Sequence, residues 1–218
     1  VVEHYRGRVH SWRVVNEAFN NDGELRDTFW LRVIGPEYIE MAFQWAHEAD
    51  PGAKLFYNDN KAEGLGMKSN VIYQFVKDLK ARGVPIDGVG LQMHVTLDGY
   101  PSPEKVSANI QRLSKLGLEV NITEMDVALE EPVTTEKLLA QGKRYQQMLE
   151  ACVSGSGCTA FITWGFTDKY SWIPDRFPGY GQALIFDETY HPKPAYHALQ
   201  KALLKSLKQH RPYSYTER

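Results

Sequence analysis

The chain alternates between strand-like and helix-like segments, and this alternation constrains the fold more than any other feature of the sequence. Runs rich in β-branched residues predict strands, and each is followed by a run with apolar residues at helical spacing. The predicted strands are 8–16, 54–58, 87–94, 118–124 and 159–164, and the predicted helices are 36–49, 69–82, 103–116, 135–152 and 194–207. Five consecutive βα units predict a parallel α/β fold, either doubly wound or a barrel.

Polar residues at the strand ends favour the barrel. They are Asn16, Glu17, Asn58, Asp59, Gln92, His94, Glu124, Asp126 and Trp164. Functional groups that converge from every strand on one mouth are typical of a (β/α)8 TIM barrel, whereas a nucleotide-binding fold would carry a glycine-rich loop after its first strand. Eight units close such a barrel and five are predicted. We therefore interpret residues 1–218 as the carboxy-terminal portion of one barrel domain, supplying strands four to eight with their helices.

Composition excludes several classes of function. The 218 residues carry a formal net charge of −2, so no basic surface predicts binding to nucleic acid or to an anionic membrane. No apolar run approaches the roughly 20 residues that a membrane-spanning helix needs. No Cys/His spacing predicts a metal site, and we expect no cofactor.

The two cysteines, Cys152 and Cys158, are separated by the flexible segment Val-Ser-Gly-Ser-Gly. A disulfide between them would close a small loop, contribute about 2 kcal/mol and imply an oxidising compartment. The alternative is a pair of free thiols.

Two glutamates are the strongest candidates for chemistry. Glu17 and Glu124 each end a strand-like run, which places two carboxylates at the mouth of the sheet. Enzymes that break glycosidic bonds typically use two carboxyl groups, one as acid/base and the other as nucleophile or second base. The alternative is that both are surface charges at strand ends.

Four segments around these residues resemble glycoside hydrolase family 10, the endo-β-1,4-xylanases. Residues 12–18 are similar to the acid/base motif of that family, 90–94 to its Gln-x-His strand and 122–126 to its nucleophile motif. Residues 164–174 resemble its aromatic wall and are the most specific segment. The resemblance implies a secreted enzyme that acts on xylan or xylo-oligosaccharides with retention of configuration, and a short disulfide at the position of the two cysteines.

By position, the resemblance assigns Glu17 as acid/base and Glu124 as nucleophile. These roles need environments that push the two pKa values apart, with Glu17 largely protonated and Glu124 ionised. Asn16 corresponds to the residue that holds the sugar 2-hydroxyl, although it could merely cap its strand. His94 is expected to orient Glu124, with Asp126 or Gln92 behind it.

The remaining expected substrate contacts are Asn58, Trp164 and Trp172. The two tryptophans correspond to apolar platforms under the sugar, with core packing as the alternative, and Trp12, Trp30 and Trp45 are assigned to packing. Asn60 and Lys61 stand where the family usually has Tyr and Asn, which puts contacts on the leaving-group side in doubt.

Arg13 is the sharpest departure, because the family typically has Asp there. Residues 13 and 17 share parity along an extended strand, so their side chains could face the same side. A guanidinium facing Glu17 would lower the pKa of that carboxyl. A bulge in the strand would instead turn Arg13 away.

In the family, the acid/base lies on strand four and the nucleophile on strand seven, so three front units are absent from this sequence. We expect a front segment, from a separate chain, a longer chain or an exchanged oligomer, to cover the open sheet edges. The competing hypotheses are a non-catalytic xylan-binding or structural remnant and another retaining glycosidase, such as a cellulase, on the same barrel. The sequence does not decide whether residues 205–218 are ordered.

Overall fold

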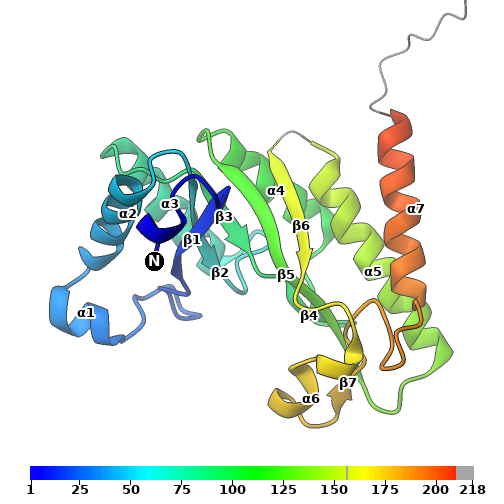
Figure 1. Ribbon diagram of the computed structural model, residues 1–218. Coiled ribbons are helices and arrows are strands. Elements are labelled where there is room, and N and C mark those ends of the chain that lie inside the picture. The colour runs from blue at the N-terminus through cyan, green and yellow to red at the C-terminus, as the bar shows by residue number, and fades with distance from the viewer. Residues whose placement is uncertain (156, 210–218) are drawn as a thin grey trace, which may run out of the picture.

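The computed structural model describes residues 1–155 and 157–209 and confirms the predicted alternation (Figure 1). The strands are β1 (Ser11–Asn16), β2 (Lys54–Asp59), β3 (Gly88–Leu91), β4 (His94–Thr96), β5 (Glu119–Glu130), β6 (Cys158–Thr163) and β7 (Tyr180–Gly181). The α-helices are α1 (Phe29–Ile34), α2 (Tyr38–Ala49), α3 (Met67–Ala81), α4 (Pro103–Ser114), α5 (Thr135–Val153), α6 (Ile173–Arg176) and α7 (Pro194–Gln209). Helix α7 thus extends into the carboxy-terminal segment, of which residues 210–218 lie outside the described part.

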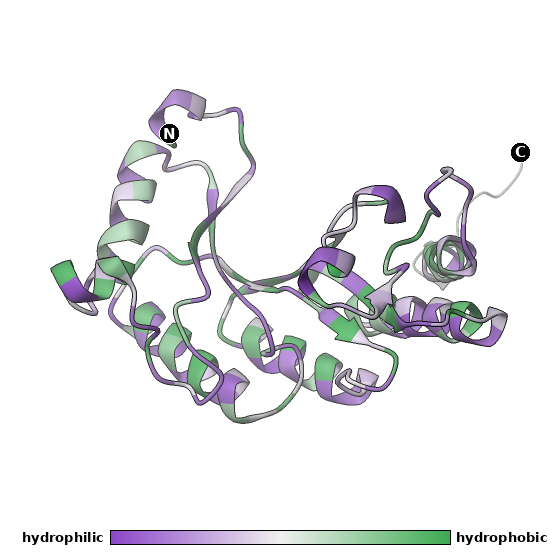
Figure 2. Cartoon of the chain, turned by 90° about the horizontal axis from the view of Figure 1, so that it is seen from below, coloured by the Kyte–Doolittle hydropathy of each residue, from purple (hydrophilic) through white to green (hydrophobic). Residues whose placement is uncertain are grey.

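The main strands form one curved parallel sheet in the order β1-β2-β3-β5, with β6 parallel to β5 on the far side. The helices lie along the outer side of the sheet and leave its inner side open (Figures 1 and 2). Their apolar faces pack on the strands, where Phe43 of α2 and Val76 of α3 are fully buried. Because the strands are parallel, their carboxyl ends meet at one mouth, and the strand-end residues gather there.

The sheet does not close. In the described part of the chain β1 pairs with β2 and has no strand on its other side, and β6 pairs with β5 alone. The architecture is therefore a partial (β/α)8 barrel with two open edges.

Large apolar side chains are exposed beside these edges. Trp30 is 57% exposed and Trp45 is 56% exposed near β1, and Ile162 of β6 is 49% exposed. The assignment of Trp30 and Trp45 to packing is therefore wrong for the described residues, in which both line an open groove beside β1. Trp12 is half-buried, and its indole Nε1 has no hydrogen-bond partner.

Strand β5 is longer than predicted. It continues through Glu124 to Glu130, because its second half pairs in parallel with β4, with His94 beside Asp126, and antiparallel with β7. The predicted strand 87–94 is correspondingly two strands, and His94 begins β4 instead of ending β3. The predictions that Glu124 and His94 end strands are wrong, although both side chains still lie at the mouth.

The disulfide between Cys152 and Cys158 is present and links the end of α5 to the start of β6. None of the described helices combines the length and apolar composition that a membrane-spanning segment requires.

Candidate active site

A cleft of ≈ 820 Å³ opens at the carboxyl ends of the strands. It collects the predicted residues Arg13, Asn16, Glu17, Gln92, His94, Glu124, Trp164 and Trp172. It also contains Asn60, Lys61, Arg26, Arg176 and Phe177. Asn58 and Asp126 lie directly behind this surface, buried and in contact with its residues.

Glu124 lies in the middle of β5, with its side chain only 8% exposed. Asn58 Nδ2 donates to Glu124 Oε1 at 2.8 Å, and Arg13 Nη1 forms an ion pair with the same oxygen. His94 Nε2 lies 3.3 Å from Glu124 Oε2. Burial raises the pKa of Glu124, but the hydrogen bonds from His94 and Asn58 and the charge of Arg13 outweigh it, so the pKa lies below its usual value. The surroundings of Glu124 therefore favour its ionised form.

His94 connects Glu124 to a buried carboxylate. Its Nδ1 lies 2.8 Å from Asp126 Oδ2, and the same oxygen accepts a hydrogen bond from Trp172 Nε1 at 2.9 Å. Burial lowers the pKa of His94, but the two carboxylates outweigh it and raise the pKa to about 9. At neutral pH the imidazolium donates to both carboxylates, which fixes the orientation of Glu124. Of the two residues expected behind His94, Asp126 contacts its ring, whereas Gln92 contacts Asn16 and Glu17.

Glu17 follows β1 directly and has a φ of 53°, a left-handed conformation that is uncommon for a residue with a side chain. Its backbone N–H donates to the Asn58 carbonyl at 2.9 Å. Its carboxylate accepts from Gln92 Nε2 at 2.9 Å and pairs with Arg26 at 3.0 Å. The side chain is 28% exposed.

The electrostatics of Glu17 differ from the prediction. Burial raises the pKa of Glu17, but the hydrogen bonds from Gln92 and Asn60 and the charges of Arg26 and Lys68 outweigh it, so the pKa lies below its usual value. Both carboxyl pKa values are thus lowered, and the expectation that only Glu124 favours ionisation is wrong for this chain. The physical reason is that Glu17 has two hydrogen-bond donors and two nearby cations, whose combined effect exceeds that of burial.

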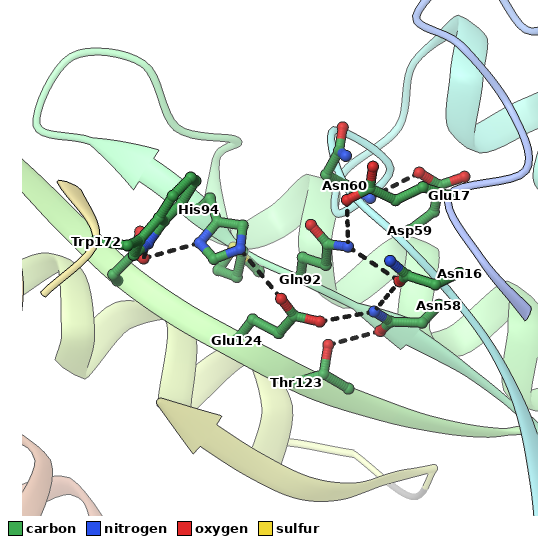
Figure 3. A network of polar contacts seen from close by, with 12 residues as sticks. Asn16, Glu17, Asn58, Asp59, Asn60, Gln92, His94, Thr123, Glu124 and Trp172 are labelled. Atoms are coloured by element: carbon green, nitrogen blue, oxygen red, sulfur yellow. Dashed lines mark hydrogen bonds and ion pairs between the residues drawn. The ribbon is translucent and has the colours of Figure 1, made fainter. Parts of the chain in front are cut away.

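A chain of side-chain amides joins the two glutamates (Figure 3). Gln92 Nε2 donates to both Glu17 Oε1 and Asn16 Oδ1, the latter at 3.2 Å. Asn58 Nδ2 donates to Asn16 Oδ1 at 2.7 Å as well as to Glu124. Thr123 Oγ1 donates to Asn58 Oδ1 at 2.7 Å and so fixes which way that amide points. One connected network therefore contains Asn16, Glu17, Asn58, Gln92 and Glu124.

The close packing of this network explains Gly90 in the Gln-x-His strand. A Cβ atom on Gly90 would lie 2.1 Å from Asn58 Oδ1. A larger residue there would displace Asn58 from Glu124.

Arg13 does not pair with Glu17. The register of β1 against β2 shifts between Arg13 and Val15, so parity along the strand no longer predicts which residues share a face. The Arg13 guanidinium instead pairs with Glu124 and lies 5.7 Å from the centroid of the Trp164 ring. The hypothesis that Arg13 faces Glu17 and lowers its pKa is therefore wrong. Arg13 contacts Glu124 and lowers the pKa of that carboxyl instead.

The two tryptophans lie beside the network. Trp164 is 43% exposed, so core packing is excluded for it. Trp172 is half-buried and contacts the His94 ring, with centroids 5.0 Å apart. Both line the cleft.

Sequence reasoning missed Arg26 and Lys68. Arg26 lies in the loop after β1, and nothing in its local pattern signals that it reaches Glu17. Lys68 lies in the first turn of α3 and is 4% exposed, and its Nζ lies 2.7 Å from Asp59 Oδ1. No group of three or more metal-ligating side chains occurs in residues 1–155 and 157–209.

Comparisons with known proteins identify the family. The family model for glycosyl hydrolase family 10 matches residues 1–202. Endo-1,4-beta-xylanase B of Thermotoga neapolitana is 47% identical over 210 residues, which are 96% of this chain and 60% of that protein. An endo-1,4-beta-xylanase of Agaricus bisporus is 42% identical over 91% of this chain and 59% of its own length.

Solved structures of xylanases are similar to this chain as well. Native xylanase 10B from Thermotoga maritima superposes with a TM-score of 0.93 at 46% identity, covering 95% of this chain and 64% of that one. Xylanase 10B from Thermotoga petrophila, solved in complex with xylobiose, gives a TM-score of 0.92 at 45% identity, covering 94% and 63%. This chain spans about 60% of the length of these curated relatives. It belongs to glycosyl hydrolase family 10.

Proposed function

We propose that this chain catalyses endo-hydrolysis of β-1,4-xylosidic bonds in xylan by retaining double displacement, once a front segment completes the barrel. The observation that carries the proposal is the single network that joins Glu17 and Glu124 through Gln92, Asn16 and Asn58. A network of this kind holds two carboxyl groups at the mouth of one cleft, where a glycosidic bond can lie between them.

The proposed reaction has two steps. In the first, Glu124 attacks the anomeric carbon, the glycosidic C–O bond breaks, and Glu17 gives its proton to the leaving oxygen. In the second, water attacks the anomeric carbon, the bond to Glu124 breaks, and Glu17 takes the proton from water. His94 supports both steps by orienting Glu124.

The open edges support the need for a front segment. Beside β1, a groove of ≈ 380 Å³ is lined by Val14, Trp30, Tyr38, Trp45 and neighbouring residues. Exposed apolar grooves and unpaired strand edges favour a protein partner. A front segment would also bury Glu17 further, which raises the pKa of a carboxyl toward that of a general acid.

Two further points belong to the proposal. The xylobiose complex of the Thermotoga petrophila enzyme supports xylo-oligosaccharides as ligands. The Cys152–Cys158 disulfide supports an extracellular location, because disulfides persist in oxidising compartments.

The test uses purified chain with and without the part of Thermotoga neapolitana xylanase B that lies outside the aligned region. We expect hydrolysis of xylohexaose only in the mixture, with the product released as the β-anomer in a proton NMR time course. Release of the α-anomer would contradict retention. Oligosaccharide binding without hydrolysis in the mixture would favour the non-catalytic alternative.

A further inference from the structure

We infer that Arg13 is a positioning residue for the nucleophile: it holds the Glu124 carboxylate from the β1 side of the cleft and makes it a better leaving group in the second step. The inference rests on the proposed function, since it assumes that Glu124 is the nucleophile.

The first observation is the division of contacts between the two carboxylate oxygens. Oε1 takes Asn58 Nδ2 and the Arg13 guanidinium, whereas His94 faces Oε2 at 3.3 Å. Arg13 therefore supplies the only full positive charge that contacts Oε1 among the described residues. The two oxygens therefore have different partners, and Arg13 acts on Oε1.

The second observation is what holds Arg13 in place. The register shift in β1 turns its side chain toward β5, and the Trp164 ring lies 5.7 Å from the guanidinium carbon. A cation beside an aromatic face is attracted by the ring. Arg13 is thus held between Glu124 and a tryptophan that lines the cleft.

The consequence follows from charge. Glu124 is an anion before attack, becomes a neutral ester when its oxygen bonds to the anomeric carbon, and becomes an anion again when water displaces it. Arg13 stabilises the anion and not the ester. It therefore slows attack, speeds departure, and keeps the glycosyl-enzyme from accumulating.

The effect of Arg13 on Glu124 must be distinguished from the effects of the other charged groups around Glu124. His94 from β4 contacts Oε2, the other oxygen of Glu124, and Asp126 from β5 lies behind His94. Glu17 is connected to Glu124 through hydrogen bonds of the side-chain amides. Arg26 offers a matched control. It is the same residue type as Arg13, each side chain is 43% exposed, and it pairs with Glu17 instead of Glu124.

The experiment is a titration of side-chain carboxyl carbons by NMR in the chain as it stands, labelled with ¹³C-glutamate. Spectra of the Glu17→Gln and Glu124→Gln variants assign the two signals. We expect Arg13→Gln to shift the titration midpoint of Glu124 upward and to leave Glu17 nearly unchanged. Arg26→Gln should do the reverse, and Arg13→Lys should give a smaller upward shift for Glu124.

An unmoved Glu124 signal in Arg13→Gln, or equal shifts of Glu124 in both variants, would overturn the inference. If Arg13→Gln does not fold, the Arg13→Lys titration and the salt dependence of the Glu124 midpoint decide between the same outcomes. These measurements need no turnover, so they stand apart from a failure of the proposed function. In a completed, active barrel, Arg13→Gln should also increase the fraction of glycosyl-enzyme trapped during turnover of an activated aryl xylobioside, as seen by intact-protein mass spectrometry.

Discussion

The two catalytic candidates occupy contrasting parts of the same sheet. Glu124 lies on β5, which is paired on both sides, and its side chain is 8% exposed with partners on both oxygens. Glu17 follows the edge strand β1, is 28% exposed, and relies on Gln92 and an arginine from a loop. The difference teaches that the surroundings of Glu124 are complete within the described chain, whereas those of Glu17 are open toward the β1 edge.

The largest expected effect is on the nucleophile side. In the completed barrel, Glu124→Ala should lower kcat by on the order of 10⁵-fold, because it removes the carboxylate proposed to form the covalent intermediate. Binding of xylotetraose, measured by calorimetry, should change little. Glu119→Ala is the control, since Glu119 lies on the same strand but outside the cleft. A loss of binding as severe as the loss of turnover would mean that Glu124 acts structurally.

The effect of replacing Glu17 on the rate of hydrolysis should depend on the substrate. Glu17→Ala should reduce hydrolysis of xylan by roughly 10²- to 10⁴-fold, the usual contribution of a general acid. Aryl xylobiosides with acidic phenols need little protonation, so their first step should be nearly spared. The two substrates are compared by initial rates, and equal losses on both would remove Glu17 from the acid/base role.

The contacts of His94 with Glu124 and Asp126 should make the free energy of unfolding sensitive to alkaline pH. The pKa of His94 rises from 6.5 to about 9 in the folded chain, so the protonated ring stabilises the fold fully below about pH 6.5. This stabilisation should be lost as the pH rises through about 9, and it amounts to about 3 kcal/mol at most. Urea unfolding at pH 6 and pH 10 measures the loss.

His94→Gln should remove most of this pH dependence, whereas replacing the exposed His47 by Gln should leave it intact. A His94→Gln variant with the same loss as the parent chain would show that other groups govern alkaline stability.

The smallest expected effect concerns Arg26. Removing its charge in Arg26→Gln should raise the pKa of Glu17 and move the upper limb of the pH profile of kcat/KM upward in the completed barrel. The pair is exposed, so the gain at alkaline pH should be roughly two- to fivefold. Arg32→Gln removes an exposed arginine that pairs with Asp27 and is the control. An upper limb that moves equally in both variants would exclude a specific Arg26–Glu17 contact.

The sequence predicted the repeated strand–helix units of this chain. Hydrophobic periodicity located the five main strands and the helices that follow them, because each must bury an apolar face. It also placed Glu17 and Glu124 at one mouth, because parallel strands share a direction. The partner of Arg13 was not predictable, since the register shift in β1 breaks the alternation on which parity depends. Arg26 was not predictable either, because the path of its loop is set by tertiary contacts.

The left-handed backbone at Glu17 has a consequence for the stability of the chain. A side chain at φ 53° costs roughly 1–2 kcal/mol that a glycine would not pay. Glu17→Gly should therefore be inactive yet unfold at higher urea concentration than Glu17→Ala, and equal midpoints would argue against strain at this position. At this position the stability of the fold and the proposed acid/base role therefore oppose each other, because the strained backbone conformation must be held in place by the surrounding structure.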